Sequence, residues 1–496
     1  MEGYILALDQ GTTSSRAILF DQEANIISIA QKEFRQIFPK PGWVEHDPRE
    51  IWETQQEVMD EAVSKAGVDY SQIISIGITN QRETIVAWDS ETEEPLHNAL
   101  VWQDTRTTDF CQSLKGTDSE TLIHQRTGLL IDSYFSGTKL KWILENVPAT
   151  QKLHKQGRLR AGTIDCWLVW KLTEGRSHVT DMTNASRTLL YNIHELKWDD
   201  DLLSIFNIPS DILPEVRPSM SDFGTLEYQG ASIPINGIAG DQQSALFGQQ
   251  CFTPGTAKNT YGTGCFMLMN TGSEAFISQN GLLSTIACSL DPSKTTYALE
   301  GSIFIAGAAI QWLRDGLKVI KNAAASEKLA KSVSESDVYM VPAFAGLGAP
   351  YWDMHARGAI LGLTRDTGVE HIVKATLDSL AYQTRDVLEA MEKDSGIALS
   401  SLNVDGGATA NNYLMQFQSD ILGREVLRPK VTESTAQGAA FLAGLCSGFW
   451  TINEIKKTRK VDRIFKTEMS DATRNKKYHG WKQAVKRSMN WVNDIS

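Results

Sequence analysis

Cysteine is scarce in this chain of 496 residues, and it shows no pattern that would bind zinc. The six cysteines form no CxxC pair and do not cluster with histidine. Since disulfide frameworks and zinc sites both need regular spacing, isolated cysteines are typical of reduced thiols in the cytosol. The sequence therefore predicts a cytoplasmic protein with free cysteines.

Long apolar runs and an excess of positive charge are also missing. The longest weakly polar run lies near residues 302–313 and is shorter than the ~20 residues that a membrane-spanning helix needs. The N-terminal apolar stretch stops at Asp9, which argues against a signal peptide. With 48 Lys and Arg against 60 Asp and Glu, the net charge of −12 disfavours nucleic acid and anionic membranes. We expect no nucleic-acid partner and no stable membrane insertion.

The exception is the basic segment 454–496, which carries 12 Lys and Arg against 5 Asp and Glu. It could be a nucleic-acid-binding tail, but Trp481, Val485 and Met489 recur at near-helical spacing. We therefore favour the solvated face of a closing helix.

The two common nucleotide-binding fingerprints are absent as well. Neither GxxxxGK[ST] nor GxGxxG occurs, so P-loop and dinucleotide-binding folds lack their signature. The composition is ordinary for a globular protein, 42% apolar and 22% charged, and the length suits two to four compact units. Strands alternate with helices, among them a capped helix between Asp47 and Gly67 and further helices over 370–393, 411–422 and 434–446. This alternation predicts an α/β protein.

One local pattern occurs twice. Residues 4–9 and 16–20 are expected to form strands joined by the polar turn 10–15, and residues 257–260 and 266–270 are joined in the same way by 261–264. The repetition suggests two related halves that meet near residue 250. Such turns are often ordinary hairpins. They can also wrap phosphate oxygens with backbone N–H groups and hydroxyls, while Arg16 adds a charged donor and Asp9 holds Mg²⁺ through water.

Two further turns follow predicted strands. Asp241 comes after the apolar stretch 233–239, where it could be the N-cap of a helix over 244–248 or a general base aimed into a cleft. Residues 404–412 form a strand, a Gly-Gly turn and a helix start, where the backbone can approach a flat ring or a phosphate. Turn glycines of this kind are common without any ligand.

A polar run, Thr79-Asn-Gln-Arg-Glu-Thr84, stands between two predicted strands. A solvated hairpin is the simple interpretation. Adjacent Arg82 and Glu83 would alternatively supply donors and acceptors that suit an uncharged polyol. Trp102 and Tyr134 could cover the carbon face of such a ligand, although a single aromatic residue more often packs in a core.

Taken in order along the chain, these motifs closely resemble the FGGY carbohydrate kinase family of the actin-like ATPase superfamily. The resemblance covers essentially the whole chain and includes both family signatures, one over 134–146 and one that begins at Gly358 and continues to Asp378. Residues 77–84, 240–243 and 259–266 match the members that phosphorylate glycerol rather than a pentulose or gluconate.

The resemblance implies an α/β fold of two ribonuclease-H-like (actin-like ATPase) domains, 1–250 and 251–496, that flank a catalytic cleft. It implies phosphate transfer from ATP to glycerol, which gives sn-glycerol 3-phosphate and ADP, with Mg²⁺ as cofactor. It also implies a homodimer or homotetramer. The two domains are expected to close over the substrates and exclude water.

The site residues are carried over from the family by position. The implied glycerol ligands are Arg82, Glu83, Trp102, Tyr134, Asp241 and Phe266. The implied nucleotide ligands are Thr12, Thr13, Ser14, Arg16, Gln242, Thr263, Gly307, Gln311, Gly407 and Asn411. Asp9 and Asp241 would lie near Mg²⁺, and Asp241 would be the general base.

Two regulatory features of some relatives are missing from the sequence. Relatives inhibited by fructose 1,6-bisphosphate use an Arg in the loop ahead of residues 240–243, where this chain has Ser232. Others are activated by phosphorylation of a His in the same region, and residues 218–240 contain none. The resemblance therefore implies neither form of control.

Two rival functions stay open at this point. Another FGGY kinase could act on a pentulose or related polyol, and would then show a higher kcat/KM on the larger substrate. A non-catalytic actin-like module could instead bind nucleotide to switch assembly, and would release no ADP in response to a polyol.

Overall fold

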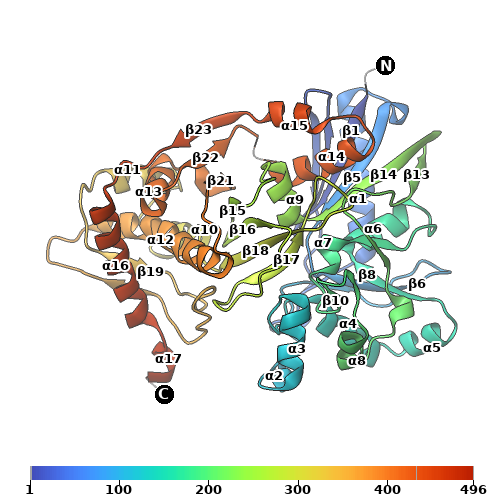
Figure 1. Ribbon diagram of the computed structural model, residues 1–496, viewed down its shortest axis with the longest axis horizontal. Helices are drawn as coiled ribbons and strands as arrows, with labels where there is room; N and C mark the ends of the chain where they lie inside the picture. The colour runs from blue at the N-terminus through green and yellow to red at the C-terminus, as the bar shows by residue number, and fades with distance from the viewer. Residues whose placement is uncertain (1–2, 432, 495–496) are drawn as a thin grey trace.

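Two α/β bodies lie side by side in the computed structural model, which describes residues 3–431 and 433–494 (Figure 1). A six-stranded sheet forms the centre of the first body, and a seven-stranded sheet forms the centre of the second. The predicted alternation of strands and helices is confirmed.

The first sheet has the order β13-β14-β5-β1-β2-β3. Its strands are β1 (Tyr4–Gln10), β2 (Ser14–Phe20), β3 (Ile26–Glu33), β5 (Ile73–Asn80), β13 (Thr225–Tyr228) and β14 (Ala231–Gly240). Strands β1, β5 and β14 are parallel, and Gln10, Asn80 and Gly240 lie level with one another. The carboxyl ends of these strands therefore meet at one edge, where polar residues from distant segments come together.

The second sheet has the order β17-β18-β16-β15-β21-β22-β23. Its strands are β15 (Thr256–Tyr261), β16 (Cys265–Gly272), β17 (Leu283–Ala287), β18 (Thr296–Ile303), β21 (Ser401–Asp405), β22 (Val426–Pro429) and β23 (Val461–Phe465). Strand β15 is antiparallel to β16 and parallel to β21, just as β1 is antiparallel to β2 and parallel to β5. The predicted repetition is confirmed, because each polar turn follows the corresponding strand of its sheet.

Smaller sheets complete the strand inventory. A four-stranded sheet contains β4 (Glu45–His46), β6 (Ile85–Asp89), β7 (Ala99–Leu100) and β8 (Leu159–Thr163). Three two-stranded sheets pair β9 (Val179–Asp181) with β12 (Glu215–Arg217), β10 (Tyr191–Asn192) with β11 (Lys197–Trp198), and β19 (Tyr339–Val341) with β20 (Ala359–Leu361).

Helices cover both large sheets. The first half of the chain contributes α1 (Pro48–Ala66), α2 (Thr108–Leu114), α3 (Asp118–Thr127), α4 (Ser136–Asn146), α5 (Ala149–Lys155), α6 (Ile164–Leu172), α7 (Met182–Ala185), α8 (Asp200–Phe206) and α9 (Asp241–Gly248). The second half contributes α10 (Gly307–Gln311), α11 (Ala325–Lys331), α12 (Val369–Ser395), α13 (Asn412–Leu422), α14 (Ser434–Cys446), α15 (Ile452–Thr458), α16 (Asp471–Ser488) and α17 (Trp491–Asp494).

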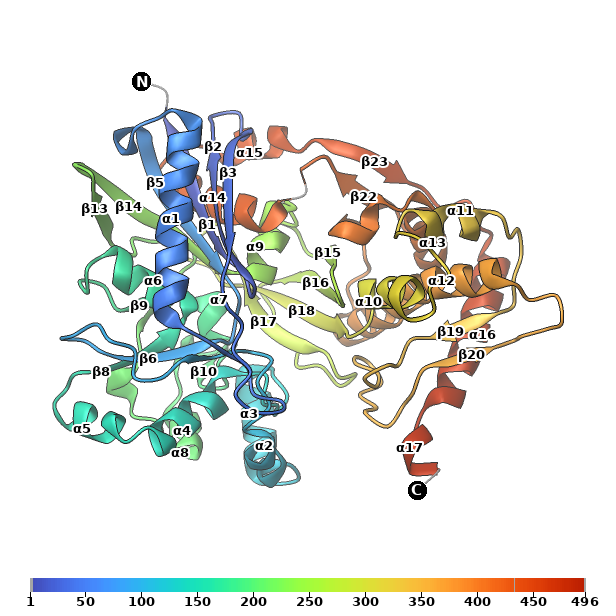
Figure 2. The same cartoon turned by 180° about the vertical axis from the view of Figure 1, so that it is seen from behind.

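Helix α1 shows how the sequence sets these elements. Asp47 accepts a hydrogen bond from the Arg49 backbone N–H (2.9 Å), Pro48 begins the helix, and Gly67 ends it in the left-handed region at φ 67°. Glu50, the third residue of the helix, accepts from the Arg35 backbone N–H (3.0 Å). The apolar stripe of α1 packs against the first sheet (Figure 2).

Helix α14 comes from the second half of the chain and packs on the first sheet. It contacts β1, β5 and β14 as well as α9, and its apolar residues join the core of the first body. Figures 1 and 2 both show it beside these elements. The chain therefore returns to the first body near its end, so the two bodies are linked by more than one crossing.

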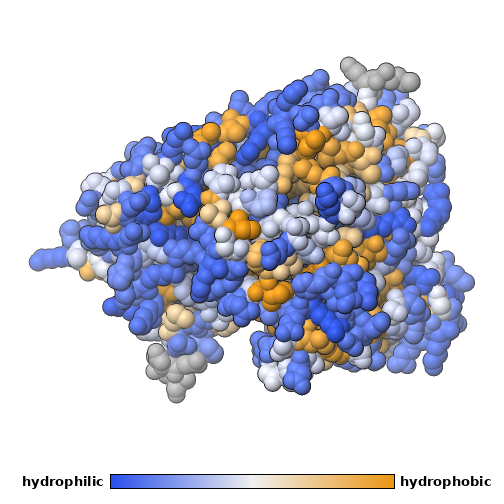
Figure 3. Space-filling view, in the orientation of Figure 1, coloured by the Kyte–Doolittle hydropathy of each residue, from blue (hydrophilic) through white to orange (hydrophobic). Residues whose placement is uncertain are grey.

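The predicted closing helix is confirmed as α16, with Trp481 and Val485 buried against the second core. Polar residues cover most of the face in Figure 3, and apolar residues gather mainly near the middle of the view, where the two bodies meet. Within residues 3–431 and 433–494, no helix is long and apolar enough to cross a membrane. All six cysteines are unpaired, as predicted.

Two histidines, the buried His46 and the partly buried His178, give the fold a dependence on pH. Burial lowers the pKa of His46 and of His178 from the ordinary 6.5 to about 4. As the pH falls through 6.5, the unfolded chain binds protons at these histidines and the folded chain does not. The contribution of the two neutral histidines to the unfolding free energy is therefore complete above pH 6.5 and is lost as the pH falls towards 4. We expect the unfolding free energy to fall by on the order of 3 kcal/mol per histidine between pH 6.5 and pH 4.

Urea unfolding at pH 7 and pH 4.5 measures this effect. The variant His46→Gln/His178→Gln should show a smaller fall in unfolding free energy than the parent, while substitution of the exposed His479 should not change the fall. Equal pH dependence in all three proteins would contradict the assignment.

Candidate functional site

The polar turn after β1 lies at the carboxyl edge of the first sheet. The Gly11 backbone N–H donates to Ser14 O (3.0 Å), and Thr12 and Thr13 stand at the tip. Thr12 Oγ1 accepts from Trp102 Nε1 (3.0 Å), and Ser14 Oγ accepts from Gln31 Nε2 (3.1 Å). The hydroxyls of Thr12 and Thr13 therefore reach the edge, whereas Ser14 is buried beside β3.

Asp9 and Arg16 face each other across β1 and β2, close to the same edge. Arg16 Nη1 lies 3.8 Å from Asp9 Oδ2 and also pairs with Glu433, just ahead of α14. Burial raises the pKa of Asp9 to about 6; Arg16 opposes this shift, and Asp241 and Glu433 add to it. Arg16 thus holds carboxylates from two separate segments, and Asp241 from a third acts on Asp9.

The segment Thr79–Thr84 is buried throughout, so the interpretation as a solvated hairpin is wrong. Strand β5 belongs to the six-stranded sheet and β6 to the four-stranded one, so the two strands do not pair with each other. Arg82 donates through Nη1 to Glu300 Oε2 (2.7 Å) and to Gln243 Oε1 (3.1 Å). Glu83 adopts a positive φ of 61°, which turns the chain between the two sheets.

Arg187 completes a group of four buried charges. Its Nε donates to Glu83 Oε1 (2.7 Å), and its Nη2 donates to Glu300 Oε1 (3.0 Å). Burial raises the pKa of Glu83 despite both arginines. Burial also opposes ionisation of Glu300, but Arg187 and Arg82 together lower its pKa to about 2.

Asp241 is the first residue of α9, and Gly240 is the N-cap, so the N-cap interpretation of Asp241 is wrong. Its Oδ1 accepts from the Gln242 backbone N–H (2.7 Å) and lies 3.3 Å from Arg82 Nε. About a third of the side chain (33%) is exposed, although Arg82 beside it is buried. The carboxylate is thus fixed at a helix N-terminus yet partly open to solvent.

A buried lysine stands next to this group. Lys258 on β15 donates to Gln242 Oε1 and to Thr260 Oγ1 (3.0 Å). Burial lowers the pKa of Lys258, and Asp405, Asp241 and Glu300 oppose the shift. The predicted nucleotide ligand Gln242 is therefore already bonded to the second sheet.

Two of the three predicted aromatic ligands are in contact. The rings of Trp102 and Tyr134 meet edge to face with centroids 5.4 Å apart, and Trp102 also bonds Thr12. Phe266 is partly buried on β16, level with Thr260 and Ser302 of the neighbouring strands. Trp102 and Tyr134 thus join the turn after β1 to the Arg82 group.

The predicted nucleotide residues of the second half lie on three segments. The Gly307 backbone N–H donates to Gly262 O (2.9 Å), and Thr263 O accepts from the Ala306 N–H (2.9 Å), so the turn after β15 abuts the start of α10. Gln311 is exposed at the end of α10. Gly407 follows β21, and Asn411 caps α13 while it also bonds Ser326 Oγ (3.2 Å).

The donor set fits Mg²⁺ held largely through water. Among the described residues no group of three His, Cys, Asp or Glu side chains is placed to hold a metal ion. Mg²⁺ usually takes only one or two carboxylates and leaves its other positions to water and phosphate oxygens. The Asp9 carboxylate, whose charge is disfavoured by burial and by Asp241 nearby, is a group that a cation would stabilise.

Sequence reasoning missed Glu300, Arg187 and Lys258. Glu300 and Lys258 are the single charged residues within strands β18 and β15, and a charged residue must be paired when it is buried. That signal was present in the sequence. It gives no indication of which distant residue is the partner.

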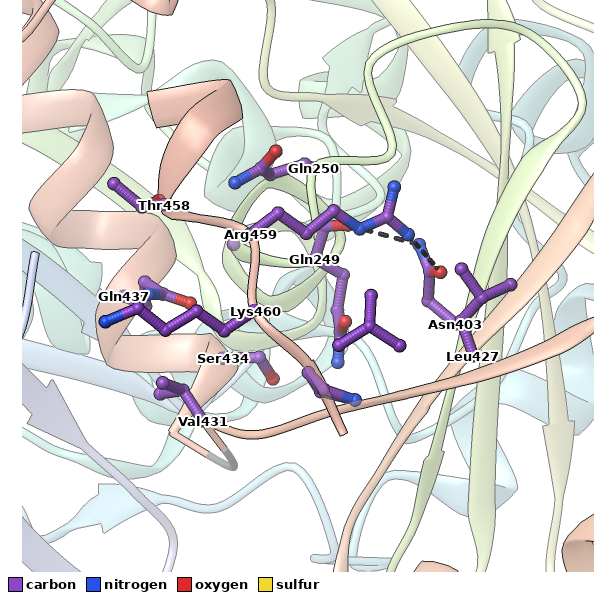
Figure 4. Close-up of a pocket in the computed structure, with 13 residues that line it drawn as sticks. Gln249, Gln250, Asn403, Leu427, Val431, Ser434, Gln437, Thr458, Arg459 and Lys460 are labelled. Atoms are coloured by element: carbon purple, nitrogen blue, oxygen red, sulfur yellow. Dashed lines mark hydrogen bonds between the residues drawn. The ribbon is translucent and has the colours of Figure 1, made fainter. Parts of the chain in front are cut away.

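A separate pocket lies at the C-terminal end of α9, between β22 and the segment that follows α15 (Figure 4). None of the predicted site residues lines it. Several of its polar groups are already bonded: Arg459 donates to Asn403 Oδ1 (2.6 Å), Gln250 donates to Ile455 O (2.8 Å), and Gln249 donates to Asp405 Oδ2 (3.0 Å). This pocket is therefore distinct from the candidate site.

Comparison with known proteins agrees with this architecture. The model of the FGGY family of carbohydrate kinases matches with its N-terminal domain over residues 4–248 and with its C-terminal domain over 257–446. The glycerol kinase of Desulforamulus reducens is 61% identical over 496 residues, 99% of each chain. The crystal structure of Plasmodium falciparum glycerol kinase with ADP is 39% identical, covers 98% of both chains and superposes with a TM-score of 0.94.

A more distant structure shows the fold alone. Gluconate kinase from Lactobacillus acidophilus is 21% identical, covers 100% of this chain and 98% of its own, and has a TM-score of 0.86. Kinases of different substrates therefore share this architecture, and a substrate has to be argued from the site. The predicted two-domain α/β fold is confirmed.

Proposed function

Because the chain belongs to the FGGY family of carbohydrate kinases, we propose that it transfers the terminal phosphate of ATP to glycerol and gives sn-glycerol 3-phosphate and ADP. The observation that carries the proposal is the contact between Asp241 and Arg82 (3.3 Å) at the carboxyl edge of the first sheet, beside Glu83. A partly exposed carboxylate next to buried polyol ligands supplies both a proton acceptor and the donors that hold an alcohol. The relatives named glycerol kinase support the same substrate.

The acceptor half of the mechanism uses residues of the first body. Arg82 and Glu83 would hydrogen-bond the hydroxyls, while Tyr134, Trp102 and Phe266 would cover the carbon chain. Asp241 Oδ2 would accept the proton of the attacking hydroxyl as transfer proceeds. Phosphoryl transfer passes through a loose transition state, so alignment of donor and acceptor matters more than a strong base.

The donor half joins the two bodies. Thr12, Thr13 and Arg16 would hold phosphate oxygens from one side and Thr263 from the other, with Ser14 and Gln242 behind them. Gly307, Gln311, Gly407 and Asn411 would bind the nucleoside part. Asp9 and Asp241 would hold Mg²⁺ through water, and the bound ion would neutralise charge on the phosphate oxygens.

We place the domain boundary near residue 250, between α9 and β15, with α14 returning to dock on the first domain. Unpaired cysteines support a cytoplasmic location. Assembly into a homodimer or homotetramer is proposed from the family.

The proposed function is tested by ADP release from Mg-ATP with glycerol, xylulose, ribulose, gluconate or no acceptor. We expect a clear preference for glycerol and, by phosphorus and carbon NMR, a product with phosphate on a terminal carbon. A higher kcat/KM on a larger sugar would identify that sugar as the substrate of this FGGY kinase in place of glycerol. Nucleotide binding without turnover would favour a non-catalytic module that switches assembly. Substantial ADP release without acceptor would contradict closure that excludes water.

A further inference from the structure

Glu300 is the one member of the buried charge group that comes from the second sheet. It stands on β18 with none of its surface exposed. Its Oε2 accepts from Arg82 Nη1 (2.7 Å), and its Oε1 accepts from Arg82 Nη2 (3.0 Å) and Arg187 Nη2 (3.0 Å). One carboxylate therefore fixes two guanidinium groups, and the bond to Arg82 has the two-pronged geometry that best defines orientation.

The four charges form a ring of zero net charge. Glu83 Oε1 accepts from Arg187 Nε (2.7 Å) and lies 3.7 Å from Arg82 Nε, so each arginine faces both glutamates. All four side chains are at most 1% exposed. Two further charges interact electrostatically with the ring: the Asp241 carboxylate with Arg82, and the Lys258 ammonium with Glu300. They add one charge of each sign around the ring. Buried charges without such balance are strongly unfavourable.

Loss of the Glu300 charge would leave the ring with an excess of positive charge. Arg82 and Arg187 would face Glu83 alone, and Arg187 Nη1 is already buried with no partner in the described part of the chain. The acceptor site would then carry one excess positive charge next to the position proposed for glycerol. An anionic analogue of the polyol would match that site better than an uncharged one.

We propose that Glu300 is a positioning residue of the acceptor site. It orients Arg82 by bonding it directly and by holding Arg187 beside it, and it brings the net charge of the site to zero. The site therefore accepts an uncharged triol and excludes anionic three-carbon acids. This inference rests on the proposed function. Because both oxygens of the Glu300 carboxylate already accept from Arg82 and Arg187, Glu300 acts through the arginines and does not touch the acceptor.

The test compares glycerol with D-glycerate in three variants. We expect Glu300→Gln to raise the KM for glycerol at least tenfold with a smaller change in kcat, and to tighten inhibition by D-glycerate relative to that KM at least tenfold. Arg187→Gln, which leaves excess negative charge, should weaken glycerol binding without any gain for D-glycerate. The variant Arg187→Gln/Glu300→Gln restores neutrality and should recover preference for glycerol, because Arg82 then faces Glu83 with no excess charge of either sign.

Each outcome decides the matter. ADP affinity, measured by calorimetry, should stay within twofold of the parent in every folded variant. Equal loss for glycerol and D-glycerate in Glu300→Gln, or an unchanged glycerol KM, would overturn the inference. If Glu300→Gln does not fold, the double variant carries the test, and its failure to fold or to prefer glycerol would overturn charge balance. Absence of glycerol turnover in the parent protein would instead overturn the proposed function.

Discussion

Replacement of Asp241 with asparagine is expected to lower kcat at least ~10²-fold, at the low end of what a general base contributes, while the fold stays intact. Asparagine has the same shape and keeps an oxygen that can accept from the Gln242 N–H, the bond that fixes Asp241 at the start of α9. What it removes is the second carboxylate oxygen's capacity to take a proton. Since the side chain is partly exposed beside Arg82, neutralising it should cost little stability.

The measurement is single-turnover ADP formation at saturating glycerol and Mg-ATP, with unfolding followed in parallel. Glycerol affinity should fall less than kcat, because Arg82 and Glu83 stay in place. Asp315→Asn, a change of the same kind at an exposed carboxylate in the second half, serves as the control and should leave both unchanged. Near-normal kcat in a folded Asp241→Asn protein would remove Asp241 from the role of base.

Features set by neighbouring residues were predictable from the sequence. The helix from Pro48 to Ala66 was recognisable because Asp47, Pro48 and Gly67 each act within one turn of it. Helix α14 begins and ends where the pattern predicted. Both polar turns were found for the same reason, since a turn is specified by the residues that form it.

Features set by distant contacts were not predictable. Arg82 bonds Glu300, which is 218 residues away in the chain, and Arg187 bonds Glu83 at a separation of 104 and Glu300 at 113. The polar run 79–84 was open to interpretation as a solvated hairpin because its charges looked unpaired. Burial of that run is favourable only once Glu300 and Arg187 are brought beside it, and no local pattern records that pairing.

The packing of α14 on α9 was hidden in the same way, and it leads to the second large expected effect. A Cβ atom at Gly438 of α14 would overlap the carbonyl of Ser244 in α9, and one at Gly248 at the end of α9 would overlap the carbonyl of Ser434 in α14. A Cβ at Gly77 of β5 would similarly overlap the carbonyl of Ala439. Backbone therefore meets backbone on both sides of α14, where no side chain can move aside.

Gly438→Ala is expected to destabilise the protein even though alanine is the better helix former by about 0.8–1 kcal/mol. Overpacking costs about 1–3 kcal/mol, occasionally more, and here the overlap is with backbone. A lower unfolding free energy in the variant would show that overlap at the close contact outweighs helix propensity, and a higher one would show the reverse. Relief of the overlap would push α9 away from α14, and Asp241 at the start of α9 would move with it.

Such a shift should also lower kcat, by up to ~10²-fold for a displacement of about 1 Å. The experiment compares urea unfolding and kcat for Gly438→Ala and for Cys446→Ala, an exposed site on the same helix. We expect the first variant to lose both stability and kcat and the second to keep both. A stabilised Gly438→Ala protein with normal kcat would mean that α14 can withdraw from α9 without moving Asp241, and that the close approach of the two helices does not hold the base in place.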